Sequence, residues 1–282
     1  MAFNSNSSTN GFTFEVTESP ITSTAPNGEV ITLAGQKALF NDNTNALLSI
    51  RSDKYQVMPN TKLVELANLA ADKFDLKIAQ FPEFNGGKKV GIVFDRPEQP
   101  FKIGEWSIEN RLVFINSHDG TKCLEIGSYD NLLRCSNQFK HIFVNMKLRH
   151  NADMWANIET LEAQILGYDE QLKTELLQIE RFIGVPIDTQ ILKEAREMVF
   201  GAALTGGKVS TQTANKVARW DNSMAIETGK LGMDVFALFN GATHFTTHNF
   251  FDAKKTTELP FFNKAADINE KVFSFCKELV AA

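Results

Sequence analysis

The sequence has few cysteines and no long apolar run. Its three cysteines among 282 residues lack C-x-x-C spacing, which argues against a disulfide framework or a zinc site. We expect Cys123, Cys135 and Cys276 to be reduced thiols in the core. The N-terminus has no basic region followed by an apolar segment, and no stretch approaches the roughly 18 apolar residues that span a bilayer. The sequence therefore predicts a cytoplasmic protein with no membrane partner.

Polar aromatic residues and positive charge are also scarce. Phe occurs 23 times, against three Tyr and three Trp, so the aromatic residues supply mainly apolar surface. The net charge of −5 argues against binding of nucleic acid or anionic membranes by the whole surface. Residues 134–150 differ, because they hold four Lys or Arg and no Asp or Glu. Two interpretations of this segment stay open: an ordinary solvated face and a polyanion site.

The composition as a whole is that of a globular protein, with 43% hydrophobic and 22% charged residues. Residues 1–28 are rich in Asn, Ser, Thr and Gly. They offer too little apolar surface to offset their chain entropy, so we expect a flexible N-terminal arm. We assign residues 29–150 to an antiparallel-sheet region and 151–282 to a helical region packed on it, either as a separate domain or as one domain with it.

One helix and several short strands are predicted before residue 150. Asn60 or Thr61 is expected to cap a helix whose apolar residues between Leu63 and Phe74 lie on one face. Asp119-Gly120 predicts a tight hairpin turn, since both residues tolerate the positive φ angles of a primed turn. Short Val-, Ile- and Phe-rich segments predict antiparallel strands at Lys88–Phe94, Phe101–Ile103, Trp106–Ile108, Leu112–Ser117 and Lys122–Ile126.

From Asn151 onward the pattern is helical. Apolar residues from Met154 to Ile183 recur at spacings of three and four, which predicts one long helix of about 30 residues ended by Gly184. Asp188 is expected to cap the next helix, which ends at Gly201. Strands followed by helices predict an α+β fold, with an antiparallel sheet and flanking helix before a helical C-terminal half that contains one long helix. The remaining predicted helices are Ser210–Glu227, Met233–Asn249 and Phe261–Leu279.

Five segments resemble a known family in their order along the chain. They are Ala46–Asn60, Asn116–Thr121, Arg134–Asn137, Lys147–His150 and Leu238–His248. Together they resemble the phage/plasmid-like proteins, the domain of unknown function numbered nine hundred and thirty-two, from roughly Gly35 to the C-terminus. The resemblance implies a bacteriophage or plasmid origin, and hence a bacterial host cell. It implies no activity and no catalytic residue.

Two enzyme motifs are incomplete. Residues 201–209 look like a phosphate-binding loop, but the Lys is displaced by an extra Gly and is followed by Val. His244 and His248 stand four apart on a predicted helix and are weak candidate metal ligands, since no third ligand is clear. We favour capping or core hydrogen bonding for this pair, and we expect no cofactor.

A carboxylate cluster around the predicted turn is a further possibility for catalysis. His118, Asp119, Glu125 and Asp130 would have to converge on one Mg²⁺ ion. In a hairpin Asp119 lies at the tip while Glu125 lies further down the second strand, so we favour a turn without a catalytic role. A role for the His118-Asp119-Gly120 turn beyond this stays open.

The basic segment and the fold class favour a non-enzymatic protein that binds single-stranded nucleic acid. A helix, an antiparallel sheet and a long helix are reminiscent of the single-strand annealing recombinases of phages, which is an analogy of architecture alone. A basic groove would neutralise phosphates while aromatic rings stack on bases, with Phe139 as a further ring. The predicted contacts are Lys88, Lys89, Trp106, Arg111, Lys122, Arg134, Lys140, Phe143, Lys147 and Arg149.

Two other functions remain open. One is a non-enzymatic structural or protein-binding oligomer of a mobile element, with Phe-rich helices as subunit contacts. The weaker one is a metal-dependent nucleic-acid enzyme centred on His118, Asp119, His244 and His248. We expect a homo-oligomer for the annealing protein as well as for the structural one. Convergence of the predicted basic residues into one groove would favour nucleic-acid binding over both alternatives.

Overall fold

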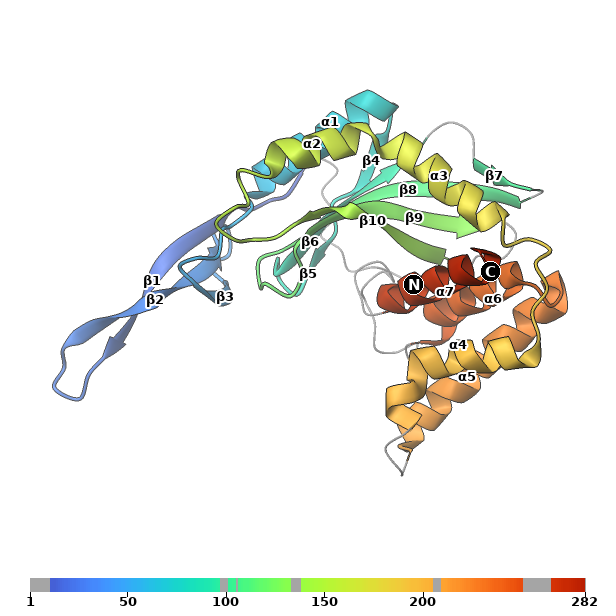
Figure 1. The fold of residues 1–282 in the computed structure, drawn as a ribbon. Helices are drawn as coiled ribbons and strands as arrows, with labels where there is room; N and C mark the ends of the chain where they lie inside the picture. The colour runs from blue at the N-terminus through green and yellow to red at the C-terminus, as the bar shows by residue number, and fades with distance from the viewer. Residues whose placement is uncertain are drawn as a thin grey trace. The chain divides into compact units, whose positions relative to one another are not determined.

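The structure is a computed structural model that describes residues 11–96, 101–104, 106–132, 138–204, 209–250 and 265–281. Within these ranges the side chains of residues 101, 106, 108, 109, 128–132, 138–145, 202–204 and 265–266 are not described. The chain divides into two compact units (Figure 1). Unit 1 consists of the described residues within 1–98, 111–127 and 142–169, and unit 2 of those within 99–110, 128–141 and 170–282.

Unit 1 begins with a small antiparallel sheet of order β1-β2-β3. Its strands are β1 (Val16–Thr24), β2 (Val30–Asn41) and β3 (Leu47–Ser52). The expectation of a flexible arm over residues 1–28 is therefore wrong for β1. Most side chains of β1 are exposed, as the composition requires, but its backbone pairs with β2. Pairing satisfies the backbone groups without burying apolar side chains, and composition alone does not report it.

A second sheet has the strand order β10-β9-β8-β6-β4, with β5 paired to β6 and β7 to β8. Its strands are β4 (Lys77–Gln80), β5 (Glu83–Phe84), β6 (Lys89–Asp95), β7 (Phe101–Ile103), β8 (Trp106–Ser117), β9 (Leu124–Leu132) and β10 (Gln138–Leu148). The strands predicted from Lys88 to Ile126 are confirmed, except that the two predicted between Trp106 and Ser117 form the single strand β8. The predicted tight turn is longer, because six residues separate β8 from β9.

The centre of this sheet is buried on both faces. Every residue of Val90–Phe94 and of Leu112–Ser117 is buried, although successive side chains of a strand point to opposite faces. Helix α1 (Asn60–Phe74) buries the predicted face with Leu63, Leu66, Ala67 and Ala70. Figure 1 shows α1 beside α2 (Ile158–Leu166), and Lys62 on α1 is 3.5 Å from Glu162 on α2.

Helix α1 receives its cap from a distant part of the chain. The N-cap residue is Pro59, and no side chain of the helix start provides the cap, so the prediction that Asn60 or Thr61 does so is wrong. The Glu15 carboxylate instead accepts hydrogen bonds from the backbone N–H of Asn60 (2.8 Å) and of Thr61 (2.6 Å). A negative charge at this end also complements the helix dipole.

The helices after α2 are α3 (Tyr168–Glu180), α4 (Thr189–Leu204), α5 (Thr211–Leu231), α6 (Val235–His244), the π-helical turn η1 (Phe245–Asn249) and α7 (Ala265–Ala281). The helix of about 30 residues predicted by the apolar repeat is divided into α2 and α3 by Gly167, which caps α2. Asp188 caps α4 as predicted, accepting from the Ile191 N–H at 2.9 Å, but α4 continues past Gly201. The α+β fold class is confirmed.

The core of unit 2 is aromatic. Phe182, Phe239 and Phe273 lie within 5.8–5.9 Å of one another, measured between ring centroids. Gly241 on α6 faces Met224 on α5 so closely that a Cβ atom would collide with the Met224 sulfur. Across the described ranges, none of the helices combines the length and apolar character that crossing a membrane requires.

We predict that Glu15→Ala lowers the free energy of unfolding by about 1 kcal/mol, because two N–H groups at the start of α1 lose their acceptor. Urea denaturation followed by circular dichroism measures this change. Glu18→Ala is the matched control, since it removes only a surface ion pair with Lys37 and should cost less. Equal losses in the two variants would contradict the capping role.

Candidate phosphate-binding site

The structure brings three of the predicted basic contacts together in unit 1. Lys147 and Arg149 line one pocket, and Arg149 and Lys122 line a second. Arg111 is instead paired with Asp95, with 3.0 Å between Nε and Oδ1. Lys88 and Lys89 lie near the start of β6, and neither is among the described residues that line the two pockets. Arg134 lies outside the described residues, as do the side chains of Trp106, Phe139, Lys140 and Phe143.

The first pocket, which we call the α2 pocket, lies between the end of β10 and α2 and has a volume of about 280 Å³. Lys147 and Arg149 contribute positive charge. The other polar residues around it are neutral: Asn151, Asn157, Thr160 and Gln164. No described carboxylate lines this pocket. Cations surrounded by amides and hydroxyls suit an anion that also accepts hydrogen bonds.

The second pocket, which we call the turn pocket, has a volume of about 290 Å³ and lies beside the loop between β8 and β9. It shares Arg149 and Asn151 with the α2 pocket, so the two pockets adjoin at these residues. Here too the described lining contains no carboxylate. The remaining lining residues are Tyr55, Gly120, Thr121, Lys122, Cys123 and His150.

Strand alternation places Lys147 and Arg149 on one side of the chain. Met146 and Leu148 are buried, whereas Lys147 and Arg149 are exposed. Residues two apart in a strand point to the same face, with about 7 Å between their Cα atoms. Lys147 at the end of β10 and Arg149 just after it therefore both face solvent.

His150 fixes the end of β10 against the loop before α1. The Gln56 N–H donates to the His150 carbonyl (3.2 Å), and His150 Nδ1 lies 3.0 Å from the Gln56 carbonyl. A carbonyl only accepts, so Nδ1 carries the proton. The Tyr55 ring stacks on the imidazole with 4.9 Å between centroids, and burial lowers the pKa of His150. Arg149 is thus followed by a neutral, fixed residue.

The loop that forms the other wall of the turn pocket is held by its own side chains. Asp119 Oδ1 accepts from the Thr121 N–H (3.0 Å) and hydroxyl (2.6 Å), so this carboxylate is already engaged. The Tyr55 hydroxyl donates to the Ser117 carbonyl (2.8 Å), and burial raises its pKa, which keeps the proton in place. Arg51 lies against Gly120, where a Cβ atom would come within 2.6 Å of Nη1. Arg51 is therefore a cation beside this loop that the sequence did not point to, although it is not among the residues that line the two pockets.

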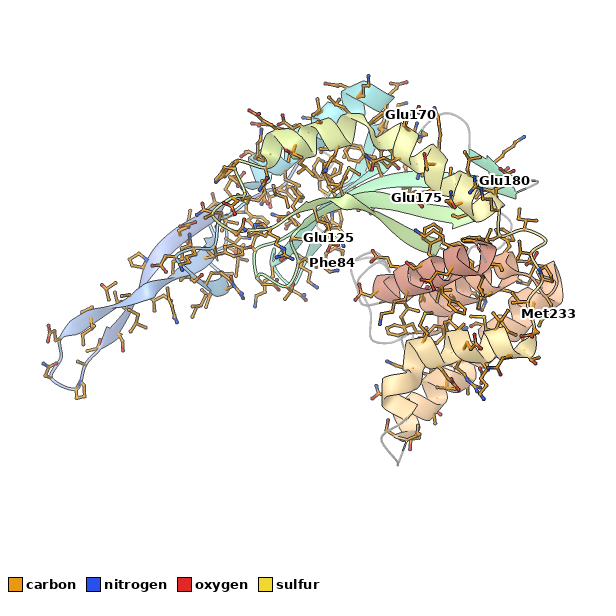
Figure 2. The ribbon with its side chains drawn as sticks, in the orientation of Figure 1. Phe84, Glu125, Glu170, Glu175, Glu180 and Met233 are labelled. Atoms are coloured by element: carbon orange, nitrogen blue, oxygen red, sulfur yellow. The ribbon has the colours of Figure 1, made fainter. Side chains whose placement is uncertain are left out.

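Lys122 contributes less positive charge to the turn pocket, and Cys123 less reactivity, than their positions suggest. Lys122 Nζ lies 3.6 Å from Oε2 of the buried Glu125, which is labelled in Figure 2. This contact partly neutralises the Lys122 charge. Burial and the nearby Glu125 raise the pKa of the Cys123 thiol, so the sulfur remains protonated and is a poor nucleophile.

His118 begins the loop between β8 and β9 and is wholly buried. The Asn60 amide donates from Nδ2 to the Phe14 carbonyl (2.9 Å), so its Oδ1 accepts from His118 Nε2 (3.1 Å). The imidazole is therefore the Nε2–H tautomer, and Nδ1 has no hydrogen-bond partner among the described residues. Burial lowers the pKa of His118 to about 3. The Ser49 hydroxyl also donates to the His118 carbonyl (2.6 Å).

The next question is whether the residues around the loop between β8 and β9 could hold the metal ion of the predicted nucleic-acid enzyme. His118 is buried, Asp119 lies on the loop, and Glu125 is engaged with Lys122. The side chain of Asp130 is not described. Within the described ranges, no three or more His, Cys, Asp or Glu residues are grouped so that they could hold a metal ion.

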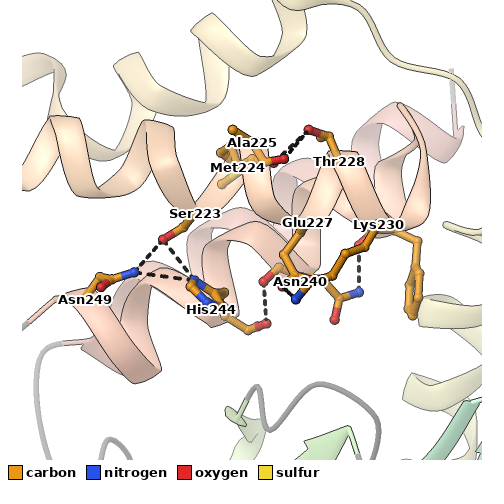
Figure 3. A network of polar contacts seen from close by, with 11 residues as sticks. Ser223, Met224, Ala225, Glu227, Thr228, Lys230, Asn240, His244 and Asn249 are labelled. Carbon is orange, nitrogen blue, oxygen red and sulfur yellow. Dashed lines mark hydrogen bonds and ion pairs between the residues drawn. The ribbon is translucent and has the colours of Figure 1, made fainter.

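In unit 2, His244 takes part in core hydrogen bonding (Figure 3). The Ser223 hydroxyl donates to the Arg219 carbonyl (2.9 Å), so its oxygen accepts from His244 Nδ1 (3.1 Å) and from Asn249 Nδ2 (3.0 Å). The His248 ring lies 4.9 Å from the His244 ring. Burial and His248 lower the pKa of His244, and Ser223 fixes its tautomer.

Part of the site was missed from the sequence. Asn157, Thr160 and Gln164 lie at spacings of three and four, which places them on one face of a helix. That spacing could have marked a polar face on α2. No pattern in the sequence shows that this face lies beside Lys147 and Arg149, because the contact joins a strand end to a helix.

Comparison with known protein families matches most of the chain. The family described as a domain of unknown function, DUF932, matches residues 47–270. Neither a curated protein nor a solved structure matches the chain.

We predict that His118 makes stability depend on pH. Its pKa of about 3 in the fold lies below the ordinary 6.5, so between these values the unfolded chain binds more protons. Stability should therefore fall as the pH drops below 6.5, by up to about 1.4 kcal/mol per pH unit from this residue. Urea denaturation at several pH values measures the slope, and His118→Gln, which retains a donor for Asn60, should flatten it.

The control is His248→Gln, because His248 is exposed and affects the slope only through its effect on the His244 pKa, which is smaller than that of burial, so its replacement should change the slope less than His118→Gln does. A wild-type slope in His118→Gln would show that the buried imidazole does not titrate as described.

Proposed function

The chain belongs to the DUF932 family, and from its own residues we propose that unit 1 binds the phosphates of single-stranded nucleic acid. The observation that carries this proposal is the pair of pockets joined at Arg149 and Asn151, lined by Lys147 and Lys122 and by no described carboxylate. In a protein of net charge −5, a site whose described lining holds cations and no carboxylate has a local field suited to an anion.

The residue types favour phosphate. A guanidinium offers a planar fork of donors that matches two phosphate oxygens, and a Lys ammonium adds a point charge. Arg149 stands at the junction of the pockets, so one phosphate can lie between Arg149 and Lys147 and the next beside Lys122. A polymer with successive phosphates would engage both pockets.

The neutral residues favour nucleic acid over a simple anion. Asn151, Asn157 and Gln164 each offer an amide donor and an acceptor, the combination that base edges present. Arg134, Lys140, Trp106 and Phe143 stay predicted contacts, because their side chains lie outside the described residues. Annealing of single strands needs no catalytic acid or base, which agrees with a site built of cations and amides.

The proposed site contains fewer cations than the groove of eight cations predicted from the sequence. Arg111 has an acidic partner in Asp95, and Lys122 is partly neutralised by Glu125. Lys147 and Arg149 are therefore the centre of the proposal. The resemblance to phage/plasmid-like proteins supports a role on a mobile element, and recombination through strand annealing is the activity we propose there.

We predict that Lys147→Glu/Arg149→Glu lowers the affinity for a labelled oligodeoxythymidine by at least about tenfold, because two phosphate contacts become repulsive. Fluorescence anisotropy measures the affinity. The neutral pair Lys147→Gln/Arg149→Gln should also reduce the slope of log K against log salt by about 1.4, since each phosphate contact on a single strand contributes about 0.7.

The matched control is Lys73→Glu/Lys77→Glu, which changes the net charge equally within unit 1. Both lysines are exposed, and Lys77 lies on β4, at the opposite end of the strand order from β10. This control should bind nearly as wild type does. Equal losses in the two charge-reversed variants would reduce the effect to net charge, and wild-type protein without salt-dependent binding would refute the proposed function.

A further inference from the structure

His244 and His248 in unit 2 bring two imidazole rings together at the end of α6. The ring planes are tilted by 52°, with 4.9 Å between their centroids. A zinc ion binds imidazole nitrogen at about 2.0–2.1 Å, which places each ring centroid about 3.2 Å from the ion. Two rings that share one tetrahedral ion therefore have centroids about 5 Å apart. The separation of the two histidines matches this value.

The backbone that carries the pair is the π-helical turn η1, which continues α6 directly. Such turns are rare and are frequent at functional sites. Phe245 packs edge-to-face on Trp220 of α5, with 5.4 Å between centroids. The Thr246 hydroxyl lies 2.8 Å from Oδ1 of Asn269 on α7. Two neighbouring helices thus hold the segment between the two histidines.

Ser223 orients His244 as a metal ligand would be oriented (Figure 3). It accepts the Nδ1 proton at 3.1 Å, so the lone pair of the ring lies on Nε2. Among the described residues, none forms a hydrogen bond with this second nitrogen. Metal-binding histidines almost always donate their other N–H to an outer acceptor, which fixes the ring. Ser223 is wholly buried and is itself bonded to the Arg219 carbonyl at 2.9 Å, so it is a fixed acceptor.

The charges around His244 leave the ring neutral. Burial lowers the pKa of His244, and His248 lowers it further, so the ring is deprotonated and able to bind metal at neutral pH. Two charged groups of α5 act in opposite directions on this pKa, because Glu227 raises it and Lys230 lowers it. These two are paired with each other, with 3.1 Å between Nζ and Oε1. They therefore present a nearly balanced field to a cation at the histidines.

We propose that His244 and His248 together bind one Zn²⁺ ion, with water in the remaining coordination positions. Zinc favours imidazole nitrogen and tetrahedral geometry. Core hydrogen bonding, the role favoured from the sequence, occupies Nδ1 of His244 and leaves Nε2 for the ion. Two protein ligands are fewer than the three of catalytic zinc sites, so the ion is bound reversibly. This inference involves unit 2 alone and does not depend on phosphate binding in unit 1.

Isothermal titration calorimetry of the chelator-treated full chain tests the site. Zn²⁺ should bind at one saturable site per chain, and excess Mg²⁺, which prefers oxygen ligands, should not compete. His248→Ala should lower the Zn²⁺ affinity at least about tenfold, since loss of an outer-shell partner alone costs about 10–100-fold. His248 is exposed, so the fold should survive this change. The matched control is His150→Gln, which removes a histidine of unit 1 and should retain the affinity.

Imidazole NMR tests whether the ion binds through the expected nitrogen. In long-range proton–nitrogen spectra of isotope-labelled protein, Zn²⁺ should shift Nε2 of His244 while Nδ1 keeps its proton. Ser223→Ala should lower the affinity by about 10–100-fold, as expected for a positioning residue. Wild-type protein without saturable Zn²⁺ binding would overturn the proposal. Zn²⁺ affinity that is unchanged in His248→Ala, or lost equally in His150→Gln, would also overturn it.

Discussion

The hydrogen bond between Asn60 and the neutral imidazole of His118 joins the parts of unit 1 on which the site depends. Asn60 begins α1 and also holds the Phe14 carbonyl, while His118 begins the loop that forms one wall of the turn pocket. Both side chains are buried, so losing either partner would leave polar atoms without compensation. A buried imidazole kept neutral is a scaffold element, and the chemistry of the site lies in Lys147 and Arg149.

The site obtains its charge from geometry rather than from composition. The chain is acidic overall, yet the alternation of β10 directs Lys147 and Arg149 outward together, and their described neighbours are amides and hydroxyls. Asp119 accepts two hydrogen bonds from Thr121 within its own loop and is not among the described residues that line the turn pocket. The positive field therefore depends on the two cations and equally on a described pocket lining that contains no carboxylate.

The sequence predicted what local periodicity determines. The apolar face of α1 and the strands β6 to β9 follow from spacings along the chain, and all are present, whereas β10 was foreseen only as a basic segment and not as a strand. Contacts between distant segments leave no such signal, and these account for the Glu15 cap, the position of Arg51 and the amide face of α2. Pairing of β1 was missed because a polar strand satisfies its backbone without the apolar residues that we used to recognise order.

Residue-resolved mapping of the bound oligonucleotide tests the central claim most directly. In a titration of isotope-labelled protein with a short oligodeoxythymidine, followed by two-dimensional amide NMR, we expect the largest shifts at Thr121, Arg149, Asn151 and Thr160. These residues line the two joined pockets. Shifts confined to α4 and α5, or no saturable shifts at low salt, would contradict a phosphate site at the end of β10.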